Sequence, residues 1–457
     1  NGQIYDWTPC ATAVAVTPAN SAICPGASTG LTASGATTYS WSPAAGLSGV
    51  SGSSVTASPS ATTIYTVTGT LTGCPFTATA TAMVGVKPQP TAVSAAASAY
   101  TVCEGSTVDL TSSVNTTSTV LSENFNSGGA GWTVLNNSTG GTPANAIWTL
   151  RTSPYVYSSV TYSSNDASTF VMSNSDAQGS GTTETYLFSP KFSTIGYSTL
   201  SLSFYHYYRD IGDAGDNARV QISTDDGATW ATANTYTATA GGASSFALST
   251  VNLNAYVGFN RVQLRFYYQA TWDWYWALDN VVITGTSAIS SWAWSSAPSG
   301  YSSGLQNPTG APVPSTRTFT MLATNAGGCT GTATTPTVTG IPAPTTSNAG
   351  PNQNICIPAG SATMAGNVPS VGTGGWSQTG GPVAASITTP SSPTSTITGM
   401  TAVGTYTFQW TISNAPCMAS SSSMTVTVGA DGDGDGYSDA CDNCPALANA
   451  SQADADG

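Results

Sequence analysis

The most regular chemistry-bearing motif is DGDGDGYSDACD, which occupies residues 431–442 near the end of the chain. Counted from its first residue, carboxylates stand at positions 1, 3, 5, 9 and 12, which are Asp431, Asp433, Asp435, Asp439 and Asp442. Gly436 at position 6 permits a sharp turn, and Tyr437 at position 7 offers its backbone carbonyl. Converging oxygens at this spacing are the ligand pattern of a calcium loop. The motif therefore predicts a calcium site, and its regularity argues against a merely acidic, disordered tail.

Outside this motif the chain carries little charge. Only 6% of the 457 residues are charged, with 8 Lys and Arg against 21 Asp and Glu. Without a basic stripe that could follow phosphates, we expect no nucleic-acid partner. No apolar run approaches the roughly 20 residues of a membrane span, so we expect no membrane insertion. The length suits several domains rather than one core.

The elements that must position these residues are predicted to be strands. Helix formers are scarce, whereas Thr, Val, Tyr and Trp are plentiful and Gly and Pro punctuate the chain. In NRVQLRFYYQA, residues 260–270, Val262, Leu264 and Phe266 point one way while Gln263 and Arg265 point the other. Such alternation is typical of half-buried antiparallel strands. The fold class is therefore all-β.

Self-comparison reveals repeats. Residues 64–86, 318–338 and 406–428 each read as a strand, a turn with a cysteine and a second strand, the closing hairpin of a small β-sandwich. Each closing cysteine has an opening one upstream, and we predict a disulfide within each sandwich: Cys24–Cys74, Cys103–Cys329 and Cys356–Cys417. Nine cysteines, several of them in turn-like settings, indicate disulfides and an oxidising, extracellular location. The repeats leave the partners of Cys10, Cys441 and Cys444 open.

The repeats predict tandem Ig-like sandwiches, one of which carries an inserted domain. Cys103 lies far from its tryptophans, so a whole domain is expected between the two halves of the second sandwich. Cys10 fits a closing hairpin whose domain lies upstream, and the alternative of a reactive thiol lacks a nearby activating cation. The expected parts are residues 1–17, the last hairpin of a preceding domain; 18–88, the first sandwich; 89–117 plus 288–341, the second; 118–287, the insert; 342–429, the third; and 430–457, an incomplete calcium repeat.

Four phrases of the insert resemble a known module: SENFNSGGAGWT, YLFSPKFSTIGYSTLSLSFYHYY, ARVQISTDDGATW and WALDNVVITG. They are similar to the jelly-roll domains called MAM-like, cleaved-adhesin or choice-of-anchor domains in bacterial surface proteins. The resemblance implies a jelly roll in which Glu123 and Asp279 hold a structural calcium ion. Asn126 stands where that family often has an acid. The alternative is that both acids cap strand ends.

Other residues of the insert suggest binding or packing rather than catalysis. TWDWYW, residues 271–276, predicts a ligand surface in which Trp272 and Trp274 stack on sugar faces and Asp273 accepts hydroxyl bonds. The alternative is that tryptophans of this stretch fill the core. STDDGATW, residues 223–230, matches the Asp-box, a structural hairpin turn. His206, the single histidine, has no nucleophile motif to serve, so we expect packing there and no enzyme.

The end of the chain, from DGDGDGYSDACDNCP onward, resembles a thrombospondin type 3 repeat, in which calcium loops follow a cysteine-tied chain. The resemblance implies that Asn449, Asp454 and Asp456 begin a further ion site. Phrases such as CPGASTGLTASGATTYSWSPAAGLS are similar to repeats of large surface and gliding adhesins of Bacteroidota, which are commonly exported by the type IX route.

These observations predict a non-enzymatic, secreted surface protein with structural calcium, whose projecting sandwiches mediate attachment or build filaments. The expected partners are a surface glycan or another cell-surface receptor, with self-association or other secreted proteins as further partners. Two alternatives stay open: a carbohydrate-binding region of a secreted hydrolase, and a structural subunit of a sheath or fibre.

Overall fold

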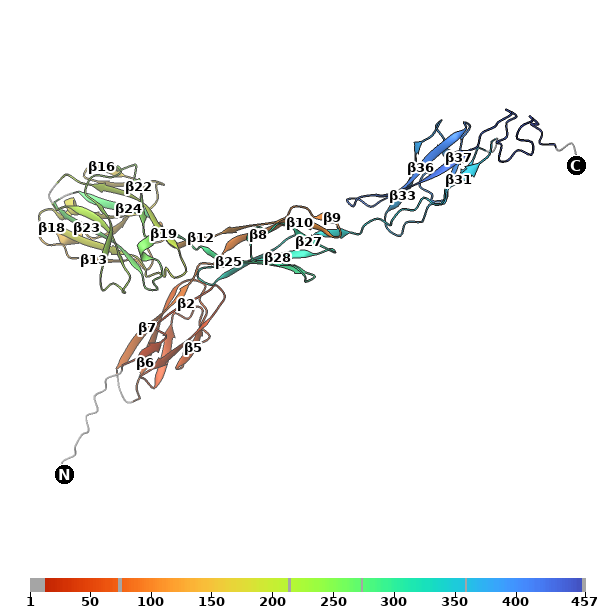
Figure 1. Cartoon of the computed structure of the whole chain (residues 1–457). Helices are drawn as coiled ribbons and strands as arrows, with labels where there is room; N and C mark the ends of the chain where they lie inside the picture. The colour runs from red at the N-terminus through yellow and green to blue at the C-terminus, as the bar shows by residue number, and fades with distance from the viewer. Residues whose placement is uncertain (1–12, 73–75, 213–214, 273, 358–359, 454–457) are drawn as a thin grey trace, which may run out of the picture. The chain divides into compact units, whose positions relative to one another are not determined.

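The computed structural model of the chain describes residues 13–72, 76–212, 215–272, 274–357 and 360–453. Strands dominate it, and the described helices are one short α-helix and two 3-10 turns: α1 (Ser175–Gln178), η1 (Pro143–Asn145) and η2 (Asn254–Tyr256). The all-β prediction is therefore confirmed (Figure 1). Within the described part, no helix has the length and apolar character needed to cross a membrane.

The contacts divide the chain into two compact units. One contains the segment up to Val93, Ser113–Trp292 and Leu322–Thr332, and the other contains Ser94–Ser112, Ala293–Met321 and the segment from Ala333 onward. All five boundaries between these segments fall in the sequence predicted to form the second sandwich. The finer domain boundaries drawn from the repeats stay predictions.

The first sandwich pairs two small sheets around an apolar centre. One sheet has the order β1-β3-β5 and the other β2-β7-β6-β4. Their strands are β1 (Ala15–Thr17), β2 (Asn20–Ile23), β3 (Thr29–Ser34), β4 (Thr38–Ser42), β5 (Ser54–Ala57), β6 (Thr63–Thr70) and β7 (Thr77–Val86). Alternate residues of β6, Tyr65 and Val67, are fully buried between the sheets beside Leu31 and Trp41. The period-2 pattern thus produces one buried and one solvated face.

The jelly-roll segment is built from two larger antiparallel sheets. One has the order β14-β17-β24-β19-β22 with β12 also paired to β24, and the other has the order β13-β18-β23-β20-β21. The first contains β12 (Thr117–Glu123), β14 (Thr149–Arg151), β17 (Phe170–Asn174), β19 (Thr199–Arg209), β22 (Ala247–Asn252) and β24 (Tyr275–Thr286). The second contains β13 (Thr133–Asn136), β18 (Thr182–Phe188), β20 (Asn217–Ser223), β21 (Ala231–Tyr236) and β23 (Gln263–Thr271). A short hairpin is formed by β15 (Tyr155–Tyr157) and β16 (Val160–Tyr162).

One large apolar core joins these two sheets. Phe204, Phe266 and Trp276 are fully buried, and the Phe266 and Trp276 rings lie 5.6 Å apart between centroids. The burial of alternate residues in β23 confirms the side-chain directions predicted for residues 260–270. The core fixes the backbone of β24, which contains the predicted metal ligand Asp279 and Trp276.

The strands that flank the jelly-roll segment form a four-stranded sheet, β26-β25-β28-β29, and three strand pairs, β10-β27, β8-β11 and β9-β30. Their bounds are β8 (Thr91–Ala97), β9 (Thr101–Cys103), β10 (Ser106–Val108), β11 (Leu110–Asn115), β25 (Ile289–Ala297), β26 (Ser302–Ser303), β27 (Ala311–Val313), β28 (Thr318–Asn325), β29 (Thr330–Thr334) and β30 (Thr339–Ile341). Trp294, predicted to mark this sandwich, is 2% exposed.

The third sandwich contains sheets of order β31-β37-β36-β33 and β32-β35-β34. Its strands are β31 (Gln353–Ile355), β32 (Ala362–Thr363), β33 (Thr373–Gly380), β34 (Ser386–Ile387), β35 (Thr396–Thr398), β36 (Gly404–Ser413) and β37 (Ser420–Val428). Trp376 and Trp410 occupy its centre with ring centroids 5.1 Å apart. From Gly429 to Ala453 the chain forms turns and bends with no strand or helix.

The disulfides differ from the predicted pairs. Cys24 is bonded to Cys329, Cys103 to Cys417 and Cys356 to Cys441. The pairings Cys103–Cys329 and Cys356–Cys417 are therefore wrong, and Cys24 is taken by a partner other than Cys74, which lies outside the described residues. Each opening cysteine is joined to a later part of the chain: the next closing hairpin for Cys24 and Cys103, and the aspartate-rich tail for Cys356.

Strand pairing explains this correction. The opening strand of each sandwich runs parallel to the closing strand: Ile23 pairs with Val86, Cys103 with Ile341 and Ile355 with Val428. The opening cysteine therefore lies where the chain leaves its sandwich. In the third sandwich the hairpin cysteine, Cys417, lies at the other end, because β37 has 9 residues, which at about 3.3 Å per residue span roughly 30 Å. A disulfide cannot bridge that distance.

Replacing Cys24 and Cys329 together by serine should lower the free energy of unfolding by about 2–5 kcal/mol, since the bond closes a very long loop. Denaturant titration measures the effect, with Cys103→Ser/Cys417→Ser as the matched control for the other unit. Peptic mapping without reductant should recover Cys24 peptides bonded to Cys329 peptides. Recovery of Cys103 bonded to Cys329 would contradict the pairing described above.

Candidate functional site

The first three aspartates of the tail motif converge. Side-chain oxygens of Asp431, Asp433 and Asp435 lie within 4.8 Å of one another. Burial raises the pKa of Asp433, and the neighbouring carboxylates raise it further. One oxygen of Asp433 is inaccessible to solvent and has no hydrogen-bond partner. Three carboxylates this close repel one another, so the cluster is a site that a hard cation would neutralise.

The loop backbone is folded around the carboxylates. Asp431 accepts hydrogen bonds from the amides of Gly434 at 2.8 Å and Gly436 at 2.9 Å. Gly434 and Gly436 have φ of +79° and +97°, values that suit glycine. Asp435 accepts the amide of Tyr437 at 2.9 Å. The alternating Asp-Gly spacing thus produces a tight series of turns that keeps the carboxylates on one side.

The tail is tied to the third sandwich by a covalent and a polar contact. Cys441 is bonded to Cys356, directly after β31. Ser438 is fully buried; its hydroxyl accepts the amide of Ile357 at 3.0 Å and donates to the carbonyl of Gly429 at 3.2 Å. These contacts fix the aspartate cluster against a folded domain, although the tail has little apolar core of its own.

The remaining tail residues predicted as ligands have different positions. Asp439 is exposed and accepts the amide of Gly432 at 2.6 Å, which uses one of its oxygens within the loop. Asp442 accepts from Gln452 at 3.0 Å, and the amide of Asn449 donates to Asp435 at 2.9 Å. Asn449 and Asp442 thus belong to the same polar network as the cluster. Asp454 and Asp456 lie outside the described residues.

The predicted ligands of the jelly-roll segment lie on paired strands. Glu123 ends β12 and pairs with Val281 of β24, two residues after Asp279. Asp279 is fully buried, and burial raises its pKa to about 6. One of its oxygens accepts the amide of Asn280 at 2.7 Å and the other accepts the hydroxyl of Ser168 at 3.2 Å. Glu123 accepts the amide of Phe125 at 2.6 Å.

Asp166 and Asn280 complete this polar region, and neither was predicted from the sequence. Asp166 accepts the side chain of Asn280 at 2.9 Å and the amide of Ser168 at 3.1 Å, and hydrogen bonds from Ser168 and Asn280 lower its pKa to about 2. Asn280 has a φ of +50°, next to the irregular pairing of β19 and β24. Among the described residues these acids form no cluster as tight as that of the tail. The local phrase SSNDAS offered a turn signal but no link to Asp279.

The tryptophans predicted to bind a ligand do not form a paired surface. Trp272 is 63% exposed, with a φ of +54°. Trp274 is half-buried, and the guanidinium of Arg209 covers its ring at 3.6 Å from the centroid. Asp273 lies outside the described residues. The Trp272 ring is therefore open for stacking, whereas the Trp274 ring is already covered by Arg209.

The other motifs of the insert have structural contacts. In the Asp-box, Asp225 accepts the amide of Thr229 at 2.9 Å and Trp230 donates to the carbonyl of Gly227 at 3.1 Å, as predicted for a hairpin turn. His206 is 2% exposed and its Nδ1 accepts the indole N–H of Trp276 at 3.2 Å. The packing role predicted for His206 is therefore seen in the core.

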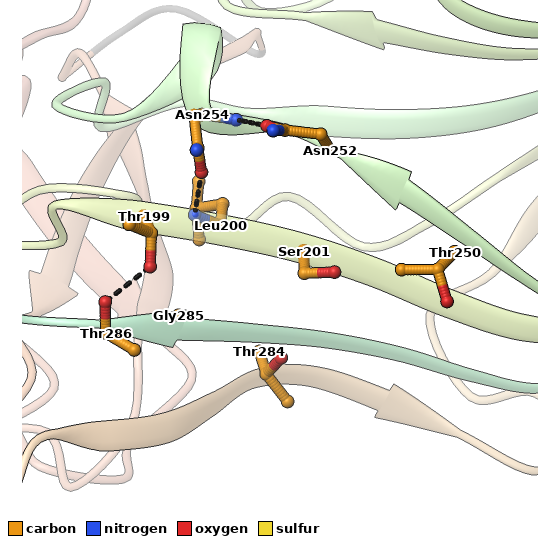
Figure 2. Close-up of a pocket in the computed structure, with 9 residues that line it drawn as sticks. All are labelled: Thr199, Leu200, Ser201, Thr250, Asn252, Asn254, Thr284, Gly285 and Thr286. Atoms are coloured by element: carbon orange, nitrogen blue, oxygen red, sulfur yellow. Dashed lines mark hydrogen bonds between the residues drawn. The ribbon is translucent and has the colours of Figure 1, made fainter.

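A hydroxyl-rich hollow lies on the outer face of the sheet that contains β19, β22 and β24 (Figure 2). Its volume is about 460 Å³, and the side chains around it are polar and uncharged except for Leu200. Asn254 accepts the amide of Leu200 at 2.8 Å, and Thr199 and Thr286 are hydrogen-bonded across neighbouring strands. These cross-strand bonds stabilise the sheet. No aromatic ring or charged group lines the hollow.

Comparison with known proteins identifies one part of the chain. Residues 349–428, which form the third sandwich, match a family model that describes a PKD domain. This part is therefore PKD-like, as predicted. A search of curated proteins found no match to the chain.

Among solved structures, the chain is similar to the K3 cleaved adhesin domain of Lys-gingipain from Porphyromonas gingivalis. The identity is 23%, the coverage is 37% of this chain and 98% of that one, and the TM-score is 0.28. The TmCBM61 module in complex with β-1,4-galactotriose shows 12% identity, 35% and 92% coverage and a TM-score of 0.24. The PKD domain of the KIAA 1837 protein shows 30% identity, 18% and 83% coverage and a TM-score of 0.17.

The buried His206 predicts an acid-sensitive jelly roll. Burial lowers its pKa from 6.5 to about 4. The unfolded chain therefore binds a proton that the folded chain does not, and stability is lost as the pH falls from about 6.5 to about 4. His206→Gln should remove this dependence. The difference in Tm between parent and variant, measured across that range, isolates the single histidine because Asp279 titrates in both proteins. A constant difference from pH 7 to pH 4 would contradict the prediction.

Proposed function

We propose that this chain is a non-enzymatic attachment segment of a secreted bacterial surface protein, in which linked sandwiches display the jelly-roll domain. The observation that carries the proposal is the set of three disulfides, each joining the opening of one sandwich to a later part of the chain. Such bonds persist in an oxidising, extracellular setting. The disulfides hold successive parts of the chain together, and they do not build one enclosed reaction site.

The nature of the surface also supports attachment. With 6% charged residues, the chain is poor in charge, and most of its exposed polar side chains are the uncharged hydroxyls and amides of Ser, Thr, Asn and Gln. Contacts made by such groups change little with ionic strength, which suits binding in media of variable salt. The jelly roll contributes most of the aromatic side chains and is the part to which we assign binding.

Attachment is tested by retention under flow. Beads coated with the oxidised chain should be retained on mucin-coated or polysaccharide-coated glass several-fold better than beads coated with albumin. Beads that carry only residues of the third sandwich fused to an inert carrier provide a second comparison, since that part lacks the jelly roll. Retention no greater than that of albumin on every surface would overturn the proposal.

We further propose that calcium is the structural cofactor of the tail and of the jelly roll. The three convergent carboxylates of the tail and the unpartnered oxygen of Asp433 support the first site. The buried carboxylate of Asp279, with Glu123 and Asp166 nearby along the paired strands and adjoining loop, supports the second. Carboxylates and backbone carbonyls are the oxygen ligands that calcium prefers.

The tail proposal predicts that Asp433→Asn weakens calcium binding at least tenfold, because one of three converging carboxylates loses its charge. Calorimetric titration with calcium chloride measures the affinity, with Glu104→Gln as a control acid elsewhere. Asp279→Asn separates the jelly-roll site, since it should remove a different binding event. If chelation changed neither the Tm nor the protease resistance of the tail, both calcium sites would be wrong.

A further inference from the structure

A second binding feature of the jelly roll lies at the edge between its two sheets. A cavity of about 260 Å³ opens between β13 and β14, beneath the loop that follows β12. Phe125, Trp132 and Trp148 contribute its aromatic lining. No glycan site was predicted here from the sequence: Phe125 and Trp132 belong to the phrase SENFNSGGAGWT, which carries only the family resemblance, and Trp148 lies in none of the motifs.

The aromatic walls are held rigidly by the core. The Phe125 and Trp132 rings meet edge to face at 5.4 Å, and Trp148 packs against the buried Trp276 at 5.6 Å. Phe125 and Trp148 are 2% and 3% exposed. Rings fixed in this way lose little conformational freedom when a ligand is bound, which favours affinity.

The mouth of the cavity is open to solvent. Val134 and Leu150 stand at its rim, each 43% exposed. Gly128 and Gly129 also line the cavity, and their φ values are +89° and +67°. Because they are glycines, no side chain extends from them across the opening. The loop thus needs glycine for its backbone, and the same glycines leave a path into the cavity.

Two polar atoms at the cavity have no partner. The indole N–H of Trp148 is buried without a hydrogen bond, and so is the hydroxyl of the neighbouring Thr149. Buried polar groups are nearly always satisfied, and exceptions call for an explanation. A ligand that brought an acceptor to the indole N–H and a hydroxyl to Thr149 would satisfy both groups.

We propose that this cavity binds one neutral pyranose ring of a glycan. This inference rests on the attachment function and names its ligand class. A pyranose presents C–H faces to aromatic rings and hydroxyls at its rim, which matches walls of Phe and Trp beside two unpaired polar atoms. No charged residue lines the cavity, so an ionic ligand would lose its hydration without compensation.

The size of the cavity and its polar atoms exclude other ligands. Sites for drug-sized molecules have volumes of roughly 300–1,000 Å³, so about 260 Å³ suits a single ring rather than several sugars. A purely apolar ligand, such as an aliphatic side chain, would leave the Trp148 N–H and the Thr149 hydroxyl unpaired. The glycan is expected to enter by one sugar, with the rest of the chain in solvent.

The test uses the oxidised full-length chain on an array of neutral and acidic glycans, followed by calorimetry with the methyl glycoside of the best neutral sugar. Trp148→Phe removes the N–H and keeps an aromatic ring, and it should weaken binding at least tenfold. Leu150→Trp places a large side chain at the exposed rim and should abolish binding. Trp292→Phe, a half-buried tryptophan of β25 that does not line the cavity, is the matched control and should bind like the parent.

Spectroscopy and folding controls complete the design. The indole N–H signal of Trp148, assigned by its loss in Trp148→Phe, should shift when the glycoside is added. Circular dichroism and Tm establish that the variants are folded, and Leu150→Trp covers the case in which Trp148→Phe is not. Binding that is equal in parent and Leu150→Trp, confined to acidic glycans, or absent would overturn the inference. Retention of parent beads on mucin, with no neutral glycan bound by the parent, would leave the attachment function standing while this site fails.

Discussion

The parallel pairing of opening and closing strands determines how this chain is organised. In all three sandwiches the opening strand lies beside the end of the last strand, so that the opening cysteine faces the exit of its own domain. Parallel pairing requires a long connection between the two strands, and here the rest of the sandwich supplies it. A bond from the exit end therefore reaches the following part of the chain. The covalent links between successive sandwiches are a consequence of strand direction.

The same geometry explains what the sequence could and could not reveal. The alternating residues of β6, β23 and β36 predicted strands, and the aspartate spacing predicted converging carboxylates. Both predictions were possible because the patterns are local in the sequence. Cysteine pairing is not local: repeated hairpins with cysteines look the same whether bonds form within one sandwich or between neighbours. Only the direction of the opening strand distinguishes the two cases, and strands as short as β9, with three residues, give no directional signal.

Sites formed by residues that lie far apart in the sequence could not be predicted either. Asp166 meets Asn280 across more than a hundred residues, and the cavity walls come from four separate strands and a glycine-rich loop. Composition could identify the tryptophans but not which of them lie at an opening. Trp272 is exposed and its sugar-stacking role stays a prediction, whereas Trp274 is covered by Arg209, a contact that no periodicity contains.

Outside the tail the chain has few charged residues, and those described below make two kinds of contact. Both ion pairs of the described residues share one acid, Asp226, which contacts Lys191 and Arg261. Other arginines lie on aromatic rings instead of carboxylates: Arg265 is 4.2 Å from the ring centroid of Trp230 and Arg209 is 3.6 Å from that of Trp274. Such cation–π contacts satisfy a guanidinium without a counter-charge. In the tail, by contrast, the carboxylates of Asp431, Asp433 and Asp435 converge on one another.

The disulfide between Cys24 and Cys329 also determines how far the chain can extend under tension. It closes a sequence separation of 305 residues, within which the whole jelly-roll segment lies. Fully extended, that length of chain would reach roughly 1,000 Å at 3.3–3.6 Å per residue. Under tension the covalent path crosses the sulfur–sulfur bond and continues from Cys329, so none of this hidden length can be pulled out. The jelly-roll segment therefore lies outside the covalent load path, and the chain between these two cysteines adds no length under tension.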